Sequence, residues 1–374
     1  MKIPEVEDFS QRLRGPQTAS RVGVWLGATM AIAFLTGLWS HFQYDTPGWL
    51  SLPTGPAWLY RVTQGLHVVA GTAAVPLLLV KLWAVFPRLF VRPPRAPRRL
   101  VLHGLERVSI ALLVSAALFQ IVSGTVNISQ WYPWAFSFRA THYAVAWVFI
   151  GALALHIAVK LPAVRDAYKG GLTEPGGAGL SRRGLLGTTG VAAGLAIVTT
   201  AGQSVPWLRN ISVFAVRSGD GPQDLPVNRS AVAAGVERAD PSSWRLAVTY
   251  EGRTRELTRG DLARLPQSVE TLPIACVEGW SASASWEGVP VADLLTMVGA
   301  PATSRVFVSS MQTRGSFATS ELPSQFAADR RTLLALRLNG EELALDHGYP
   351  CRIIAPNRPG VMQTKWVNRL DVYA

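Results

Sequence analysis

The 374-residue chain contains little cysteine and little charge. It has two cysteines, Cys276 and Cys351, and neither belongs to a C-x-x-C pair. Two thiols are too few for a disulfide framework or a four-thiolate metal site, so any thiol function depends on a single sulfur. Charged residues make up 16% of the chain and hydrophobic residues 49%, which is too apolar for a disordered protein. We therefore expect folded structure, part of it in lipid.

Acidic residues are scarce in the first half of the chain. Residues 1–205 carry 18 Lys and Arg against 7 Asp and Glu, whereas residues 206–374 carry 18 against 17. The net charge of +12 therefore belongs to the apolar half. Its arginines stand in short stretches between apolar runs and not on a soluble module with interleaved aromatics, so we expect no nucleic-acid partner.

Apolar runs of about 20 residues, the length that spans a ~30 Å hydrocarbon core, occur five times. They predict membrane helices over residues 22–41, 59–86, 108–128, 143–161 and 185–203. The fifth run is less hydrophobic, because Gly, Thr and Ala replace Leu and Ile. We expect an all-α transmembrane bundle of four helices in residues 1–165, then a linker, residues 166–206, that carries a fifth, anchoring helix.

The short connections between these runs hold 15 Lys and Arg on one side and 2 on the other. Basic residues are retained in the cytoplasm, so the N-terminus lies inside and five crossings place the chain after residue 205 outside the cytoplasmic membrane. The fifth run opens with Ser181-Arg182-Arg183-Gly184-Leu185-Leu186, which resembles a twin-arginine export signal. The alternative is that both arginines are positive-inside anchors, which predicts the same topology.

Five of the six histidines lie in or at the ends of the apolar runs: His41, His67, His103, His142 and His156. Ionisable residues are costly in hydrocarbon and usually mark function. His142 and His156 are 14 residues apart, which in a helix places them within about 40° of one face and ~21 Å apart. That arrangement fits axial ligands of two stacked haems, and the alternative is buried, hydrogen-bonded histidines.

The other histidines are assigned by depth in the membrane. His67 lies in the outer third of its helix and matches His142, whereas His103 is the best depth match to His156. We expect His41 to be an interfacial residue, and Lys81 to extend to the inner interface.

With the stretch T-H-Y-A-V-A-W-V-F-I-G-A-L-A-L-H, these histidines resemble bacterial b561-type di-haem cytochromes and the cytochrome b subunits of formate dehydrogenases and hydrogenases. The resemblance covers about 140 residues and implies one or two haem b groups and a quinone or quinol partner. It departs from those families in the first helix, which has Trp25 and its neighbours where an inner-leaflet histidine is common.

Residues 207–374 show an α+β pattern with evenly mixed charges. Alternation predicts a strand over 244–250 and a buried strand over 306–308, and Thr258 is placed to cap a short helix. A second helix is expected over 291–297. Asn339-Gly340, between apolar runs at 333–338 and 342–345, predicts a type I′ hairpin. About 165 residues suffice for a core of their own.

The run Leu272-Pro-Ile-Ala-Cys276-Val-Glu278-Gly-Trp280-Ser281 places a lone cysteine between a strand and a loop. At a loop rim it is placed to offer a thiolate, the protein ligand expected for a soft, high-valent metal. The run resembles the molybdenum-ligand loop of the sulfite oxidase family, in the C-V-E-x-W-S version of periplasmic methionine sulfoxide reductases. Asp346-His347-Gly-Tyr-Pro-Cys351-Arg352 with Gln363-Thr364-Lys365-Trp366, and Leu225-Pro-Val-Asn228-Arg229, resemble two further motifs of that family in the same order.

This resemblance implies a sulfite oxidase-type fold and a molybdopterin cofactor, with Cys276 as catalytic molybdenum ligand. Arg352 and Lys365 would neutralise the pterin phosphate. The remaining expected cofactor contacts are Asn228, Ser310, His347, Gln363 and Thr364. Alternatives are that His347 caps the hairpin and that Arg352 pairs with Asp346, while Cys351 is expected in the core. Arg314 and Arg358 are candidate contacts for a substrate anion, with ordinary surface arginines as the alternative.

The two resemblances together predict a membrane-anchored, molybdopterin-dependent oxidoreductase. We expect it to pass electrons between the quinone pool, b-type haem and molybdenum, with oxygen-atom transfer on an S-oxide or N-oxide substrate. One alternative is sulfite-type oxidation with electrons flowing to haem. The other is a haem b electron carrier whose C-terminal domain is a non-catalytic scaffold. The chain ends shortly after the Lys-Trp motif without an immunoglobulin-like dimerisation domain, so we expect a monomer.

Overall fold

A computed structural model describes residues 5–10, 12–129, 131–169, 172, 174, 179–215, 221–240 and 242–374. The chain divides into two compact units. The helical unit comprises Met1–Leu38, Leu66–Gly202 and Asn210–Phe214, and the sheet unit comprises Trp39–Gly65, Gln203–Arg209 and Ala215–Ala374. The sheet unit thus includes two stretches that lie before residue 207, where the sequence alone starts the C-terminal domain. One reason is Leu52, which is 2% exposed and lies in the main core of the sheet unit.

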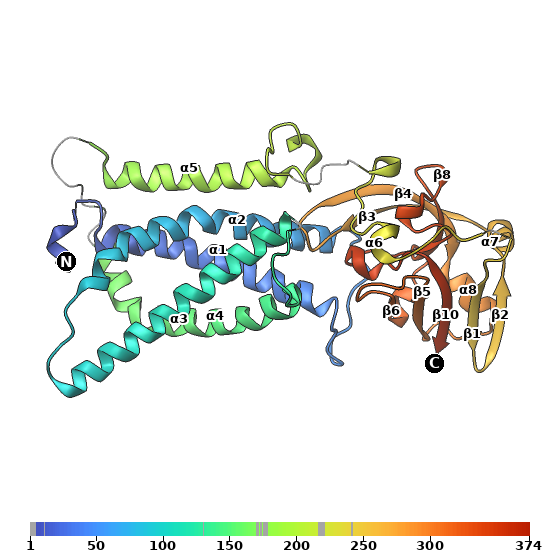
Figure 1. Ribbon diagram of the computed structural model, residues 1–374, viewed down its shortest axis with the longest axis horizontal. Coiled ribbons are helices and arrows are strands. Elements are labelled where there is room, and N and C mark those ends of the chain that lie inside the picture. The colour runs from blue at the N-terminus through green and yellow to red at the C-terminus, as the bar shows by residue number, and fades with distance from the viewer. Residues whose placement is uncertain are drawn as a thin grey trace. The chain divides into compact units, whose positions relative to one another are not determined.

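Long helices dominate the helical unit (Figure 1). They are α1 (Pro16–Phe42), α2 (Leu59–Val85), α3 (Pro97–Ile128), α4 (Phe138–Lys169) and α5 (Arg182–Ala201). All five are long and apolar enough to cross a membrane. Each overlaps one of the expected spans, and several extend beyond it because a membrane helix continues through the headgroup region with more polar turns. Short 3-10 turns occur at Val6–Asp8 and Phe86–Phe90.

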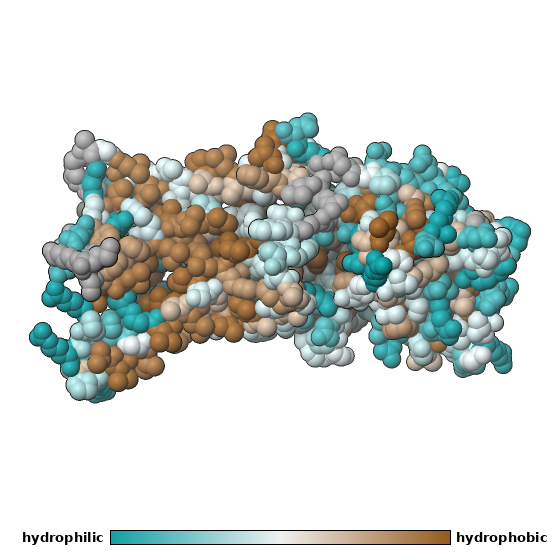
Figure 2. Space-filling model, in the orientation of Figure 1, coloured by the Kyte–Doolittle hydropathy of each residue, from teal (hydrophilic) through white to brown (hydrophobic). Residues whose placement is uncertain are grey.

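The first four helices share one apolar core. Its fully buried members come from all four: Met30, Ala74, Leu78, Ala116, Ala117 and Phe149. Helix α5 also packs into the unit, because its Leu186 lies in a cluster with Val22 and Leu77. Many other large side chains of these helices are apolar and exposed, and they give the helices the hydrophobic surface in Figure 2. Lipid is the environment in which such a surface is stable.

The sheet unit is built on two five-stranded sheets. The first has the order β2 (Arg253–Leu257), β1 (Leu246–Tyr250), β10 (Val367–Tyr373), β5 (Arg305–Ser310), β6 (Thr319–Leu322). The second has the order β3 (Ser268–Ala275), β4 (Ser281–Pro290), β7 (Leu333–Leu338), β8 (Glu341–Glu342), with β9 (Arg352–Ile354) also paired to β7. Strands β1 and β10 are parallel and the other pairs are antiparallel. The α+β character expected from the sequence is therefore present.

Short helices and turns connect these strands. They are α6 (Ala231–Ala234), α7 (Arg259–Arg264), α8 (Val291–Met297), α9 (Ser324–Ala327) and 3-10 turns at Pro206–Leu208, Pro222–Asp224, Leu345–His347 and Gly360–Met362. Thr258 caps α7 as expected. Its side chain accepts a hydrogen bond from Asp261 N, and the Asp261 carboxylate accepts one from Thr258 N. Asn339 and Gly340 have φ values of 50° and 82°, which fits the expected type I′ turn.

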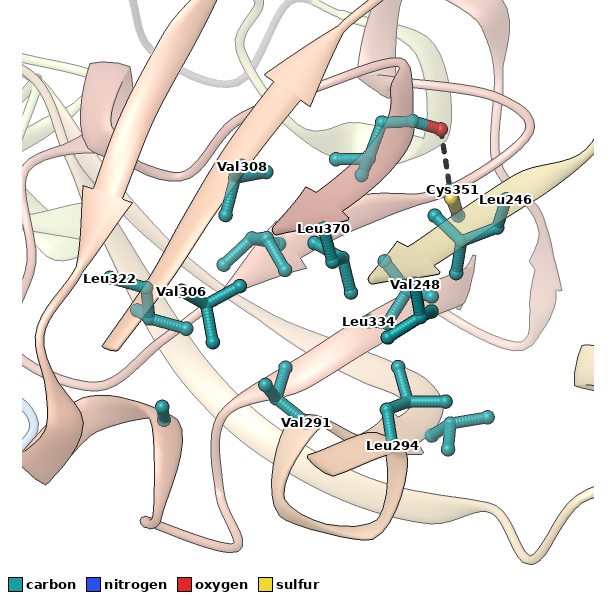
Figure 3. Packing of buried hydrophobic residues seen from close by; sticks show 14 of the residues in the cluster. Leu246, Val248, Val291, Leu294, Val306, Val308, Leu322, Leu334, Cys351 and Leu370 are labelled. Atoms are coloured by element: carbon teal, nitrogen blue, oxygen red, sulfur yellow. Dashed lines mark hydrogen bonds between the residues drawn. The ribbon is translucent and has the colours of Figure 1, made fainter. Parts of the chain in front are cut away.

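Strand β7 separates two hydrophobic cores, because its successive side chains point to opposite faces. Leu334 and Leu336 lie in a core shared with α8 and the first sheet, whereas Leu333 and Ala335 lie in a core with β3 and β4. Figure 3 shows the first of these cores, in which the Cys351 thiol donates to the Val367 carbonyl (3.4 Å). Cys351 is fully buried there, so its expected place in the core is confirmed.

Candidate functional site

Cys276 lies in the second core, at the tight turn between β3 and β4. Its backbone N–H donates to Trp280 O (2.9 Å), and Gly279 N donates to Cys276 O (3.0 Å). The cysteine is 1% exposed and packs with Trp280 and Tyr349. The expectation of a thiol at an exposed loop rim is therefore wrong, because these aromatic side chains cover the turn. Burial, with the nearby Glu278 carboxylate, raises the pKa of the Cys276 thiol well above its usual value.

A second loop, residues 357–360, lies directly beside this turn. Ala275 and Pro359 form an isolated parallel bridge, and a Cβ on Gly360 would lie 2.9 Å from Ile274 Cγ2. The loop carries Arg358, which is 4% exposed and donates to Glu321 O (2.9 Å). The interpretation of Arg358 as a surface residue is wrong, since the loop folds inward against β3. Arg314, in contrast, is exposed.

The turn that follows β8 brings two further cations together. The Arg352 guanidinium donates to His347 O (3.0 Å) and Gln363 O (3.1 Å), and Lys365 Nζ donates to Asp346 O (2.9 Å). The alternative pairing of Arg352 with the Asp346 carboxylate is wrong, because that carboxylate accepts from Ala231 N (2.7 Å). Three of the residues that resemble family motifs, His347, Arg352 and Lys365, thus form one cluster.

Gly348 makes this close approach possible. Its φ is +111°, and an added Cβ would lie 3.1 Å from the Cβ atoms of both Arg352 and Lys365. Only glycine combines that backbone conformation with so little space. The sequence motif contains this glycine, but its function as a spacer between two cations depends on the three-dimensional packing.

Three buried cations therefore surround the site: Arg352, Arg358 and Lys365 are 3%, 4% and 8% exposed. Within the described ranges, none of them forms an ion pair with a carboxylate. Burial lowers the pKa of Arg352 to about 9 and that of Arg358 to about 10, and it lowers the pKa of Lys365 well below its usual value. Buried Arg352 Nε and Arg358 Nη1 have no hydrogen-bond partner among the residues that the structure describes. Buried charge is costly unless paired, so the cluster fits an anionic ligand such as a phosphate.

The other expected cofactor residues line the same region but are engaged with protein groups. Ser310 Oγ donates to Lys365 O (2.7 Å), Thr364 Oγ1 bonds Ser320 Oγ (2.6 Å), and Asn228 Oδ1 accepts from Arg229 N (3.0 Å). The Gln363 amide donates to Arg358 O (3.0 Å), while its buried Oε1 has no partner.

His347 joins two 3-10 turns, since its Nε2–H donates to Pro222 O (2.7 Å). Burial and the Arg352 cation lower the pKa of His347 to about 4, so the ring is neutral at pH 7. A neutral ring with Nε2 protonated presents Nδ1 as an acceptor.

In the helical unit, His67 of α2 and His142 of α4 face each other. Their ring centroids are 6.2 Å apart. The Nδ1–H of His67 donates to Ala33 O (2.8 Å), and Nδ1 of His142 hydrogen-bonds Ser123 Oγ (3.0 Å). Among the described residues neither Nε2 atom has a hydrogen-bond partner. The pairing of these two histidines by depth is thus matched by their contact.

His156 and His103 behave differently, because they make no ring contact with each other in the described part of the chain. His103 Nε2 accepts from Arg107 Nε (3.4 Å), while Lys81 and Lys160 are the basic groups near His156. Lys81 Nζ donates to Ala19 O (2.7 Å), which lies in the first turn of α1. The expected pairing of His103 with His156 through a haem stays a prediction. His41 lies 4.0 Å from Asp45 at the end of α1.

The twin-arginine segment forms the start of α5. Ser181 is the N-cap and accepts from Gly184 N (2.9 Å), while the Glu174 carboxylate accepts from the backbone N–H groups of Arg182 (2.8 Å) and Arg183 (3.1 Å). A serine and a carboxylate therefore cap the N-terminus of α5, and these contacts use only the backbone of the two arginines. Residues 170, 171, 173 and 175–178 of the expected linker lie outside the described residues.

Comparison with known proteins identifies the C-terminal part of the chain. The family described as "Oxidoreductase molybdopterin binding domain" matches residues 233–374. These residues are a molybdopterin-binding oxidoreductase domain. We refer to residues 233–374 as the molybdopterin domain. It contains Cys276, Arg352, Arg358 and Lys365, whereas Asn228 precedes it.

Curated relatives support this assignment. The mitochondrial sulfite oxidase of Mus musculus is 26% identical over 165 residues, covering 37% of this chain and 30% of that protein. The sulfite oxidase of Arabidopsis thaliana is 33% identical over 114 residues, covering 26% of this chain and 29% of that protein. YedZ1 of Azospira oryzae, named as a protein-methionine-sulfoxide reductase subunit, is 30% identical over 138 residues, covering 37% of this chain and 52% of that protein.

Among solved structures, the sulfane dehydrogenase SoxCD of Paracoccus pantotrophus has 25% sequence identity and a TM-score of 0.34, with 37% of this chain and 40% of that chain covered. The chain spans about half or less of the length of these three curated relatives.

Sequence reasoning missed the contribution of the stretch before α2. Asn357, beside Arg358, is 1% exposed and accepts from Tyr60 N (2.8 Å), and its amide donates to Pro53 O (2.6 Å). The hydroxyl of Tyr60 hydrogen-bonds Ser40 Oγ (3.0 Å). No local pattern in residues 43–64 signals the contacts of Asn357, because they join positions about 300 residues apart in the chain.

Proposed function

We propose that this protein is a membrane-anchored, molybdopterin-dependent oxidoreductase that exchanges electrons with the quinone pool through b-type haem. One observation carries the proposal: Cys276, the single thiol of the site, lies with three buried cations that lack carboxylate partners in the described structure. A pterin cofactor supplies both a metal for the thiolate and a phosphate for the cations. The family of the molybdopterin domain supports the same cofactor.

The residues of the site have separate tasks in this proposal. Cys276 would hold molybdenum, and metal binding would displace the thiol proton that burial otherwise retains. Arg352 and Lys365 would bind the phosphate, Arg352 as a bidentate hydrogen-bond donor and Lys365 as a point charge. Neutral His347 would accept a hydrogen bond from the pterin through Nδ1. Arg358, beside the turn, would attract the polar oxygen of a substrate.

The cofactor supplies oxygen-atom transfer when bound. We propose that an S-oxide or N-oxide is the oxidant: it accepts two electrons and two protons, the bond from sulfur or nitrogen to oxygen breaks, and water leaves. The run Cys276-Val-Glu278-Gly-Trp280-Ser281 supports this direction by its similarity to methionine sulfoxide reductases. Glu278 itself is fixed, since its carboxylate accepts from Trp280 Nε1 (3.0 Å).

Sulfite-type oxidation is the second candidate, and Arg358 is the observation that favours it. A buried guanidinium with an unpartnered Nη1 suits a small anion such as sulfite better than a neutral S-oxide. Sulfite and water would then give sulfate, two protons and two electrons, and the electrons would pass to haem in the helical unit. Turnover of purified protein with methionine sulfoxide and a reduced dye, compared with sulfite and an oxidised dye, separates the two directions.

Haem b is proposed between His67 and His142. Metal–imidazole bonds are about 2 Å long and a ring centre lies about 1 Å behind its nitrogen, so two rings on one iron stand about 6 Å apart. The observed 6.2 Å agrees with this distance. An added Cβ on Gly37 would lie 2.9 Å from His67 Cε1, so a glycine in α1 leaves room for the ring. His156, with His103 as the best depth match, would serve a second haem.

The proposed location is the cytoplasmic membrane, with the molybdopterin domain on the outer side. The 15 to 2 distribution of basic residues among the connections supports it. Membrane lipid, a quinone or quinol and a small-molecule or protein S-oxide are the proposed partners, and we propose a monomer.

Quantifying molybdenum and haem in purified full-length protein tests the proposal. We expect molybdenum that depends on Cys276, and a b-type spectrum that weakens in His67→Ala and is lost in the combined His142→Ala and His156→Ala variant. Haem without molybdenum would instead indicate an electron carrier with a scaffold domain. Unchanged haem in the triple variant of these histidines would refute the ligand assignment.

A further inference from the structure

The turn that carries Cys276 is held by residues from outside the molybdopterin domain. Gln64, in the second turn of α2, donates from Nε2 to Val277 O (3.3 Å). Ser204, just after α5, donates from Oγ to Gly279 O (2.7 Å). Two carbonyls of the turn, one on each side of Glu278, are therefore bound by side chains that precede residue 233 in the chain.

Two neighbouring contacts fix these partners. Ser281 N, at the end of the turn, donates to Gln203 O (3.0 Å). Arg61 joins both sides, since it donates to Ser204 O (2.8 Å) and to Ser283 Oγ (3.1 Å). Residues 61–64 and 203–204 thus form a clamp on the Cys276 turn, and all of these residues belong to the sheet unit. We call this set, Arg61, Gln64, Gln203 and Ser204, the turn clamp.

The turn clamp adds to hydrogen bonds that the turn makes within itself. Cys276 N donates to Trp280 O, and Gly279 N donates to Cys276 O. Val277 O and Gly279 O accept from the clamp in partly buried positions, where losing a hydrogen bond is costly. Gln64 is 5% exposed, so water does not readily replace its amide.

We propose that Gln64 and Ser204 are positioning residues for the molybdenum ligand, and that the molybdenum site is complete only with the first turns of α2 and the stretch after α5. This inference rests on the proposed function. By binding the carbonyls on either side of Glu278, the two side chains set the direction in which the Cys276 thiolate points. Removing a group that hydrogen-bonds to a metal ligand's surroundings and orients the ligand typically lowers activity by about 10–100-fold. Gln64 also lies three residues before His67 in α2, so the helix that orients one proposed metal ligand carries another.

The chain offers a matched control for Gln64. Gln325 donates from Nε2 to Leu52 O, also at 3.3 Å, and therefore joins the same chain stretch, 39–65, to the domain by the same kind of bond. Its acceptor does not belong to the Cys276 turn. Gln64→Leu and Gln325→Leu remove equivalent hydrogen bonds, and only the first affects the support of Cys276.

The test uses full-length protein purified in detergent with its cofactor. For Gln64→Leu and Ser204→Ala we expect dye-linked kcat per molybdenum atom to fall about 10–100-fold, with an altered Mo(V) electron paramagnetic resonance spectrum. Gln325→Leu should match the wild type in both readouts. A merely structural role would lower the amount of loaded protein but leave kcat per molybdenum and the spectrum unchanged.

The outcomes separate this inference from the proposed function. If the wild type contains no molybdenum, the proposed function fails. If the wild type contains molybdenum but Gln64→Leu and Ser204→Ala both behave as Gln325→Leu does, the positioning role is refuted and the function stands. Should Gln64→Leu not accumulate, Ser204→Ala decides alone, because it removes a single oxygen atom.

Discussion

Gly348→Ala tests whether the close approach of Arg352 and Lys365 builds the anion site. Two costs add at this position. An alanine at φ +111° adopts backbone that costs an L-residue about 1–2 kcal/mol. Its Cβ would also lie 3.1 Å from the Cβ atoms of both cations, inside the ~3.5–4.0 Å of ordinary contact. These atoms move only with their backbones, so overpacking adds about 1–3 kcal/mol.

Gly340→Ala is the matched control, because it has the first cost without the second. Gly340 has φ +82°, and no heavy atom lies within 4 Å of an added Cβ. We expect Gly340→Ala to lose about 1–2 kcal/mol and Gly348→Ala about 2–5 kcal/mol. At about 2–4 °C per kcal/mol, Tm should be about 2–12 °C lower in Gly348→Ala than in Gly340→Ala.

The assay combines thermal unfolding, followed by near-UV circular dichroism, with molybdenum content per protein. Gly348→Ala should lose molybdenum, since separating Arg352 from Lys365 weakens the phosphate site, whereas Gly340→Ala should retain it. Equal Tm values and equal molybdenum in the two variants would show that the spacing of the cations is irrelevant, and the anion-site argument would fail.

Three further predictions concern other groups. Cys276→Ser replaces a soft thiolate by a hydroxyl and should abolish turnover with the fold intact. Cys351→Val keeps a small apolar side chain in the core, so it should lower the free energy of unfolding by less than about 1.5 kcal/mol and leave activity in place. The reverse pattern in a turnover assay would contradict the ligand assignment. The pKa of His347 is about 4 in the folded protein against 6.5 ordinarily, so the unfolded chain takes up the His347 proton first as pH falls. Between pH 7 and pH 4 the free energy of unfolding should therefore fall by up to about 3 kcal/mol, and by less in His347→Gln. Denaturant unfolding at each pH measures this, and an equal pH dependence in the two proteins would refute burial of the ring. A reporter that is active only outside the cytoplasm, fused after Ala374, should be active, and an inactive fusion in a stable protein would overturn the five-crossing topology.

The periodicity and composition of the sequence alone predicted most local structure. The apolar runs predict the long helices because a span in lipid requires about 20 apolar residues whatever its neighbours are. Asn339-Gly340 predicts its turn because positive φ at two successive positions is a property of those residue types. The same holds for Thr258, whose capping bond closes within four residues.

Burial and long-range contact are different, because they depend on which chain segments meet. The sequence placed Cys276 at the rim of a loop and Arg358 among surface residues. In the structure Cys276 is buried with Trp280, and Arg358 is buried because the 357–360 loop packs against β3. The rings of His67 and His142, which the depth argument pairs, lie 6.2 Å apart, but depth along a helix does not specify which face a side chain occupies, so such a contact is a property of the packing. The contacts of Gln64 and Ser204 join residues 213 and 75 positions apart, and no local preference encodes such a bond. The tertiary structure decided these features because burial and hydrogen-bond partners are set by atoms that the fold, and not the adjacent sequence, brings together.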